Sequence, residues 1–250
     1  MMNQTKKLAY TGIMTALVFL ATFLVKIPIP FSTGYIHLGD CMVFLAALLL
    51  GWKYGAFAAG VGSMLADIMG GYAIWAGPTL IIKSVMALII GLALRNMKTG
   101  SKFVYGSSAV ILWTAFIIGM RRILTGGMEN QIDELAQIME KDTTQLTGLA
   151  NVSSSVLVIS AVAVLALVAG IYIYLRKKEN KIDLMFIIGL VSAGLWMVTG
   201  YYLTEYLLYG NKIVPIFSIP LNLLQFTVGL IIASAVYLPL KKYYNHIFID

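Results

Sequence analysis

Residues 40–69 read DCMVFLAALLLGWKYGAFAAGVGSMLADIM, and the number of membrane crossings in this chain depends on how they fold. The segment is apolar along most of its length, with Gly-Trp-Lys-Tyr-Gly at 51–55 in its middle. As one helix it would cross a membrane once, whereas two short helices joined at Gly51 would cross twice. Each half, 40–50 and 54–69, is shorter than the roughly 20 residues of a full crossing. The charged residues elsewhere in the chain decide between the two interpretations.

The composition indicates a membrane protein. Of 250 residues, 60% are hydrophobic and only 12% are charged, and the mean hydropathy is +0.86. A soluble domain carries about twice that charged fraction. The isoelectric point near 9.4 does not indicate nucleic-acid binding, because the basic residues flank apolar runs instead of clustering in a soluble segment. The single cysteine, Cys41, excludes an intramolecular disulfide and a Cys-rich metal site.

Apolar runs and the breakers between them predict eight spans. These are about 8–25, 40–50, 54–69, 79–94, 103–119, 153–175, 184–203 and 219–238. The first run is longer than the apolar region of a usual signal peptide, so we interpret it as a retained span.

The basic residues support this count. With the N-terminus in the cytoplasm, 12 of the 18 Lys and Arg residues lie on the cytoplasmic side, five lie outside, and Lys83 lies within a span. Cytoplasmic loops are enriched in Lys and Arg. One long helix over 40–69 would instead place Arg95, Lys98 and Lys102 outside. We therefore predict an all-α polytopic membrane bundle of about eight transmembrane helices, with both termini cytoplasmic.

The segment 128–149 differs from the spans around it. It carries five acidic residues, and its apolar residues recur at helical spacing. This pattern predicts an amphipathic helix on the outer surface. It is either a connector between the fifth and sixth spans or a lid over a substrate.

Sequence motifs for nucleotide hydrolysis and for common hydrolases are absent. The sequence has no Gly-x-x-x-x-Gly-Lys-Ser/Thr, His-Glu-x-x-His or Gly-x-Ser-x-Gly motif. We therefore expect neither an enzyme nor a bound cofactor or metal.

Several polar side chains fall at the outer ends of predicted spans. Asp67 and Lys83 are embedded in apolar runs, where a charge costs roughly 2.5–3.5 kcal/mol on insertion scales unless it faces protein or water. Glu205 lies among tyrosines, and Asn222 and Gln225 are three apart on one helix face. Together they suggest a cup for a flat, hydrogen-bonding ring. The alternatives are a mutual Asp67–Lys83 salt bridge and polar contacts that merely hold helices together.

Three stretches carry a resemblance to a known family. They are Lys-Ile-Pro-Ile-Pro at 26–30, Tyr-Ile-His-Leu-Gly-Asp at 35–40, and Ile-Pro-Leu-Asn-Leu-Leu-Gln at 219–225, which pairs with Glu205. With Ala-Asp at 66–67, Gly-Gly-Tyr at 70–72 and Lys83, they resemble the riboflavin-type S components of energy-coupling factor (ECF) vitamin transporters. The resemblance covers 6–96 and 184–242.

The resemblance implies a substrate-binding subunit without chemistry of its own. It would capture a vitamin or precursor at the outer face and dock onto a transmembrane T component with two cytoplasmic ATPases. Family members dock through small residues on the first helix, for which Gly12 and Ala16 are the nearest match here. The predicted substrate site is Tyr35, His37, Asp67, Tyr72, Lys83, Tyr201, Glu205, Asn222 and Gln225, and the loop 31–40 would close over the ligand.

The chain departs from the family pattern at 97–183, where two further spans and the acidic segment follow a core that usually has six. We therefore predict three parts: family-like spans over 1–96, an inserted pair over 97–183, and family-like last spans over 184–250. Riboflavin, pyridoxine-like and pyrimidine-like compounds fit the predicted cup equally well. A proton-coupled secondary transporter and a membrane scaffold are the other classes of function consistent with the sequence.

Overall fold

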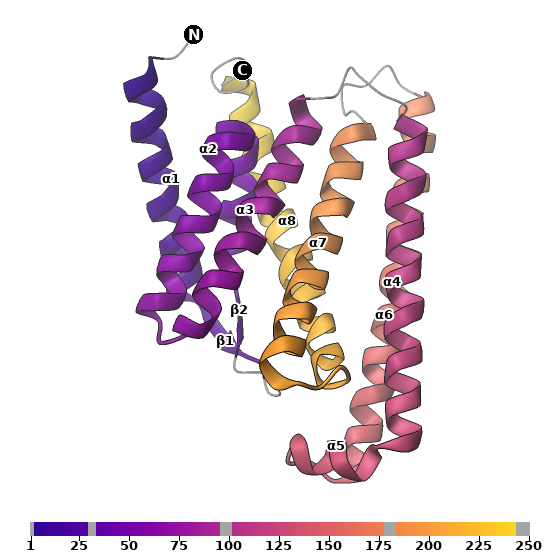
Figure 1. Cartoon of the computed structure of the whole chain (residues 1–250). Helices are drawn as coiled ribbons and strands as arrows, with labels where there is room; N and C mark the ends of the chain where they lie inside the picture. Colours follow the sequence, from indigo (N-terminus) through magenta and orange to yellow (C-terminus); the bar gives the residue numbers. More distant parts are fainter. Residues whose placement is uncertain (1–2, 30–33, 96–101, 178–183, 244–250) are drawn as a thin grey trace.

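The computed structural model describes residues 3–29, 34–95, 102–177 and 184–243, and these form an all-α bundle (Figure 1). The elements in chain order are α1 (Gln4–Leu24), β1 (Lys26–Pro28), β2 (Tyr35–His37), α2 (Gly39–Met69), α3 (Ala73–Arg95), α4 (Lys102–Asn130), α5 (Ile132–Ile138), α6 (Thr143–Lys177), α7 (Leu184–Tyr209), the 3₁₀ helix η1 (Val214–Ser218) and α8 (Ile219–Tyr243). The predicted all-α polytopic class is confirmed.

Helix α2 is two antiparallel arms. Gly51 breaks it with φ 72° and ψ −171°, a conformation essentially restricted to glycine. The arms lie so close that a methyl group added at Gly55 would sit 2.6 Å from the carbonyl oxygen of Ala46. Both outer ends of α2 reach the β1–β2 hairpin, since Gly39 follows β2 closely and the Tyr35 hydroxyl donates to Asp67. The predicted break at 51–55 is confirmed.

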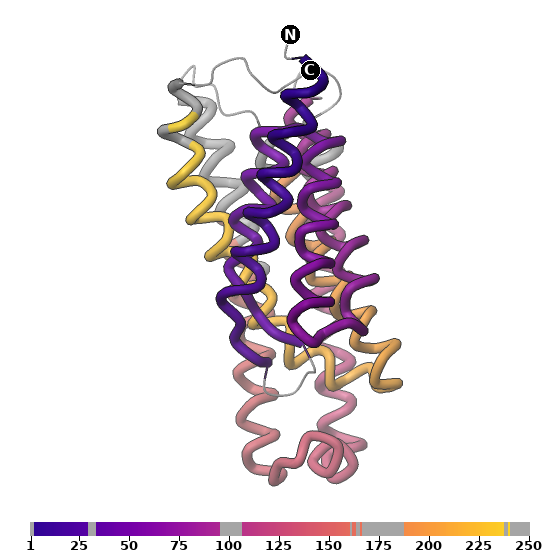
Figure 2. Tube along the Cα trace, turned by 90° about the vertical axis from the view of Figure 1, so that its left-hand side faces the viewer, coloured from indigo at the N-terminus to yellow at the C-terminus, as the bar shows by residue number. Residues whose placement is uncertain are grey.

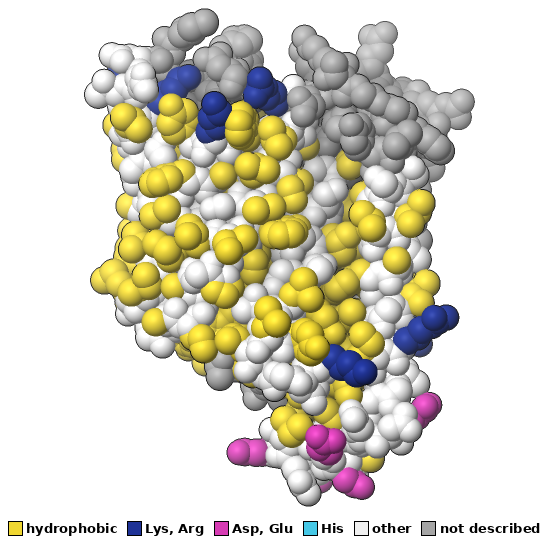
Figure 3. All heavy atoms as spheres, viewed as in Figure 1, with side chains coloured by type: hydrophobic (Ala, Val, Ile, Leu, Met, Phe, Trp, Pro, Cys, Tyr) yellow, Lys and Arg dark blue, Asp and Glu magenta, His cyan; other side chains and the backbone are white. Residues whose placement is uncertain are grey.

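With α2 counted as two arms, the described part of the chain runs along the bundle eight times, in α1, the two arms, α3, α4, α6, α7 and α8. Within the described residues, five helices are long and apolar enough to cross a membrane by length and composition. In the face seen in Figure 3, a broad hydrophobic zone lies between the two ends of the molecule: Asp and Glu gather at the tip, and Lys and Arg lie at the opposite end and also near the tip. This is the arrangement of a multi-pass membrane protein.

The prediction of one amphipathic helix over 128–149 is wrong. Helix α4 continues to Asn130, the short α5 follows, and α6 begins at Thr143, so the segment is the tip of a long helical hairpin. Figures 1 and 2 show this tip extending beyond the ends of the other helices. Its apolar residues include Leu135 and Leu146, which are fully buried in a core shared with α7, η1 and α8. The apolar residues of the segment therefore serve packing against the rest of the bundle.

Two hydrophobic cores divide the described bundle. The first draws on α1, α2, α3, α7 and α8, and centres on side chains such as Phe44, Met86 and Ile90. The second draws on α4, α5 and α6, and α7, η1 and α8 complete it with side chains such as Val198 and Phe217. Helices α7 and α8 thus pack on both. The division at 97–183 stays a prediction, although the second core is built around that segment.

We expect Gly51→Ala to lower the free energy of unfolding by about 1–3 kcal/mol, because alanine is strained at this φ and ψ. Heat unfolding of the detergent-purified protein measures the change. Gly148→Ala is the matched control, since Gly148 lies inside α6 with no atom within 4 Å of an added methyl group. Equal unfolding midpoints for the two variants would contradict the break at Gly51.

Candidate substrate site

A cavity lies beneath the β1–β2 hairpin, where α2, α3, α7 and α8 meet. The described residues that line it are Ile29, Gly34, Tyr35, His37, Asp67, Trp75, Thr79, Tyr201, Glu205, Asn222 and Gln225. Measured as the space open to the centre of a water-sized sphere, its volume is about 20 Å³. This is room for about one or two water molecules, so a ring-sized ligand requires the walls to move apart.

Seven of the nine predicted substrate-binding residues line this cavity. They are Tyr35, His37, Asp67, Tyr201, Glu205, Asn222 and Gln225. They come from four elements, β2, α2, α7 and α8, so no single helical periodicity could have grouped them. Tyr72 and Lys83 are the two that do not line it.

The hairpin that covers the cavity is fixed to the bundle at two points. Ile27 of β1 pairs with Ile36 of β2, in an antiparallel ladder of three residue pairs. The Tyr35 hydroxyl donates to Asp67 Oδ1 of α2 at 2.6 Å, and the His37 backbone N–H donates to Gln225 Oε1 of α8 at 2.9 Å. Residues 31–33 of the predicted covering loop lie outside the described residues.

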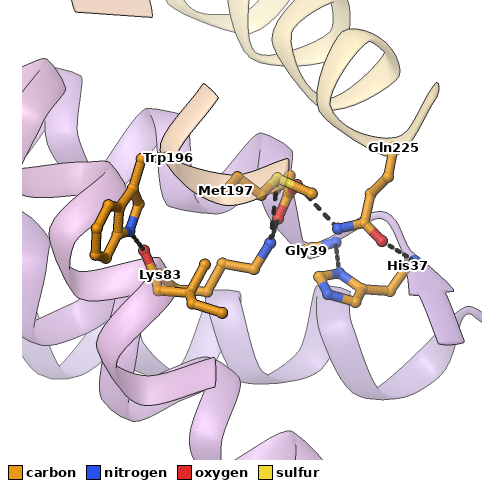
Figure 4. A network of polar contacts seen from close by, with 8 residues as sticks. His37, Gly39, Lys83, Trp196, Met197 and Gln225 are labelled. Carbon is orange, nitrogen blue, oxygen red and sulfur yellow. Dashed lines mark hydrogen bonds and ion pairs between the residues drawn. The ribbon is translucent and has the colours of Figure 1, made fainter. Parts of the chain in front are cut away.

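A buried polar network lies behind the cavity (Figure 4). The Lys83 ammonium forms an ion pair with Asp40 Oδ1, and both side chains are fully buried. Gln225 donates from Nε2 to Asp40 Oδ2 at 3.0 Å. The network therefore joins α3, the start of α2, and α8, and through Gln225 it also holds the backbone of His37.

The structure replaces the expected Asp67–Lys83 salt bridge with the Asp40–Lys83 pair. The position of Lys83 explains the difference, because α3 begins at Ala73 and not near Thr79. Lys83 lies ten residues into that helix, about 15 Å along its axis instead of one turn from its end. It thus pairs with Asp40 in the interior, where its ammonium lies 5.2 Å from the centroid of the Tyr201 ring. Tyr72 packs its ring on Tyr35, with the centroids 4.4 Å apart, and supports the hairpin from outside.

The imidazole of His37 is held in one protonation state. Its Nδ1 accepts the backbone N–H of Gly39 at 3.0 Å, so the ring proton of the neutral form lies on Nε2. Burial, followed by the nearby Lys83 ammonium, lowers the pKa of His37 from 6.5 to about 3. His37 therefore meets a ligand as a neutral side chain at physiological pH.

We expect His37 to lower stability as the pH falls below 6.5. Below that pH the unfolded chain binds a proton on His37 that the folded protein does not bind. The free energy of unfolding therefore falls by about 1.4 kcal/mol for each unit that the pH drops between 6.5 and 3. His37→Asn should lose that slope, because asparagine keeps an acceptor and does not titrate. Heat unfolding of both proteins from pH 7.5 to 4.5 tests this. Parallel profiles would show that His37 titrates normally in the fold.

Comparison with known proteins identifies the family. The model of the family described as "ECF-type riboflavin transporter, S component" matches residues 2–165 and again 152–242. The chain belongs to this family. The family is a transport family and not an enzyme family. The matched ranges also run through 97–183.

One curated relative is similar over a short segment. It is an "uncharacterized protein in gap 3'region" from Pyrococcus woesei, 51% identical over 74 residues. The matched segment is 30% of this chain, and it spans about half of the relative's length, 49%. No solved structure matches the chain.

The predicted docking residues of the S component lie on an open helix face. Gly12 and Ala16 are exposed on α1, and an added methyl group at Gly12 meets no atom within 4 Å. Their neighbours Leu8 and Ile13 are 60% and 57% exposed. The face is apolar, as is typical of a helix surface that contacts lipid or a partner helix.

Sequence reasoning missed part of the site of this S component. Asp40 was recognised only as a family residue, although Lys83 needed a buried counter-charge and Asp40 is the other acid next to an apolar run. Trp75 and Thr79 line the cavity from the first turns of α3. The predicted span began at Thr79 and therefore left out Trp75. A helix start near Ala73, just after the Gly70-Gly71 turn, would have placed both at the outer end.

Proposed function

We propose that this S component captures a vitamin or vitamin precursor in the cavity beneath the β1–β2 hairpin and delivers it for ATP-driven uptake. The observation that carries the proposal is the convergence of seven predicted binding residues from four elements on one cavity. A site with aromatic walls and a few convergent polar groups is typical of small-molecule binding. The hairpin contacts of Tyr35 and His37 make it the cover that has to move for a ring to enter.

The cavity faces the outside in this proposal, and both termini are cytoplasmic. The described basic residues Lys6, Lys53 and Arg95 are exposed at the end where α1 begins and α3 finishes. The acidic residues of the tip lie at the opposite end, beyond the hairpin (Figure 3). The positive-inside rule then places the hairpin and its cavity at the outer surface.

The energy comes from partner subunits in this proposal. The sequence has no phosphate-binding loop, so ATP hydrolysis falls to two ATPases coupled through a T component. The exposed face of α1 around Gly12 and Ala16 is the proposed contact with the T component, since small residues let helices approach closely.

Mass spectrometry of small molecules released from the detergent-purified protein tests the substrate proposal. A vitamin bound in stoichiometric amount, and lost when Glu205 is changed to Gln, supports it. A protein that stays empty after purification with added riboflavin, pyridoxine and hydroxymethylpyrimidine contradicts it. Uptake by the chain alone that follows a proton gradient and not ATP would instead support a secondary transporter.

We expect Gly12→Leu to impair association with the ATPase module while ligand binding stays unchanged. The leucine adds bulk to the open α1 face, where a methyl group added at Gly12 meets no atom within 4 Å. Co-purification of T component and ATPases with the tagged protein measures association. Gly119→Leu is the matched control, because Gly119 has the same empty surroundings on α4, which packs against α6 and α7 and not against α1. Normal association of Gly12→Leu would remove α1 from the interface.

A further inference from the structure

We propose that Lys26 is a positioning residue, which holds the β1–β2 hairpin closed over the cavity and sets how fast a ligand enters and leaves. The inference rests on the proposed function, since it concerns entry into the same cavity. In the proposed orientation Lys26 lies on the outer side, where the positive-inside rule does not account for a lysine. Its contacts supply a different reason for it.

The Lys26 ammonium lies where several segments of the chain meet. Lys26 is the first residue of β1, and its Nζ lies 4.3 Å from the centroid of the Phe23 ring near the end of α1. The same atom lies 5.3 Å from the ring of Tyr35 in β2, and 5.5 Å from the ring of Tyr72 between α2 and α3. A cation within about 6 Å of a ring centroid is attracted to the ring. One side chain thus connects both strands of the hairpin to α1 and to the turn after α2.

The end of α2 leaves room for this ammonium. A methyl group added at Gly70 would lie 2.0 Å from Lys26 Nζ and 3.1 Å from its Cε, so the side chain lies against bare backbone there. Gly70 is the C-cap of α2, and a cation at the C-terminal end of a helix is stabilised by the helix dipole. The ammonium therefore has a second source of attraction, independent of the rings.

Tyr35 is the residue through which Lys26 acts on the cavity. Its ring packs on Tyr72 with the centroids 4.4 Å apart, and its hydroxyl donates to Asp67 Oδ1 at 2.6 Å. Tyr35 also lines the cavity, so it belongs to the cover that moves when a ring enters. An ammonium over both tyrosine rings stabilises the arrangement in which this cover is closed.

This geometry predicts an effect on rates and not on affinity. Lys26 is not among the described residues that line the cavity, so it stabilises the closed hairpin whether the cavity is empty or filled. Its removal raises the open population in both states by the same factor. Association and dissociation then become faster together, and their ratio, the Kd, stays unchanged. A residue that contacts the ligand would change the Kd instead.

Amide hydrogen exchange of the ligand-free, detergent-purified full chain measures hairpin opening without any ligand. The reporter amides are the backbone N–H of His37, which donates to Gln225 Oε1, and that of Ile29, which donates to the Gly34 carbonyl at 3.2 Å. Lys26→Met keeps the length of the side chain and removes its charge. We expect it to speed exchange at the hairpin about fivefold, while exchange in α4 and α6 stays as in the parent.

Stopped-flow binding measures the consequence for a ligand. The probe is whichever of riboflavin, pyridoxine and hydroxymethylpyrimidine binds the parent protein. Lys26→Met should raise the association and dissociation rate constants about fivefold each, and the Kd should change by less than about twofold.

Three matched variants assign the effect to the cation. Lys26→Arg keeps a cation that stacks on aromatic rings, so it should restore the slow exchange of the parent. Phe23→Leu should speed hairpin exchange in the parent and have a clearly smaller effect in Lys26→Met, because the two side chains share one contact. Lys53→Met is the control, since the Lys53 ammonium lies 4.8 Å from the centroid of the Trp52 ring at the break in α2, far from the hairpin.

The contrary outcomes separate this inference from the proposed function. Unchanged hairpin exchange in Lys26→Met overturns the inference, as does faster exchange that extends equally to α4 and α6 or that Lys26→Arg fails to reverse. A changed Kd with an unchanged association rate overturns it too, because Lys26 would then act on the bound ligand. A parent protein that binds none of the three compounds, and that does not associate with an ATPase module, fails the proposed function, while hydrogen exchange still decides whether Lys26 holds the hairpin.

Discussion

We expect Lys83→Ala to lower the free energy of unfolding by about 3–5 kcal/mol, one of the two largest effects foreseen for this protein. The substitution leaves Asp40 fully buried without its counter-charge, although the Gln225 amide still donates to it. The midpoint of heat unfolding in detergent, followed by size-exclusion chromatography, measures the change. Lys83 was predicted to bind the substrate, and its buried ion pair with Asp40 makes stability the larger expected effect.

The control is the paired replacement Lys83→Met with Asp40→Leu. It removes both charges together, so it should cost clearly less than Lys83→Ala or Asp40→Ala alone. Strict additivity of the two single changes would show that the two charges are not coupled in the folded protein.

The second large effect is expected for Gln225→Leu, which should weaken ligand binding about tenfold or more and also destabilise the fold. Gln225 accepts from the backbone N–H of His37 and donates to Asp40. Its removal takes the hydrogen bond from the buried His37 N–H and from Asp40 Oδ2, at about 1–3 kcal/mol each. The hairpin over the cavity then loses its attachment to α8. Titration with the co-purified vitamin and heat unfolding measure the two consequences separately.

Two further variants sharpen this prediction. Gln225→Glu keeps the acceptor for His37 but places a carboxylate beside Asp40, so its stability should be low at neutral pH and recover partly on acidification. Gln137→Leu, at an exposed position of α5, should change neither measurement. Normal binding by Gln225→Leu would show that the hairpin does not depend on α8.

The predicted spans agree with the observed helices where apolar runs end at strong breakers. The break at Gly51 was predicted from the two glycines that flank Lys53. The structure shows a backbone conformation at Gly51 that only glycine adopts readily. Boundaries were less well predicted where a helix leaves the apolar zone. Helix α3 begins at Ala73 despite Pro78 inside it, and α4 continues to Asn130, because packing against neighbours stabilises turns that composition alone assigns to loops.

The sequence by itself determined the class of protein, the two arms of α2 and the residue types of the site. Each of these follows from local information: apolar length, breakers, and polar groups too costly to bury without a purpose. Only the tertiary structure decided that Lys83 pairs with Asp40 and not with Asp67, and that Gln225 joins the network to the hairpin. Pairing depends on distances between side chains on different helices, and those are set by where each helix begins and how the helices pack. In this protein the start of α3 moved Lys83 from the cavity wall into the interior, and the cavity was left with its carboxylates.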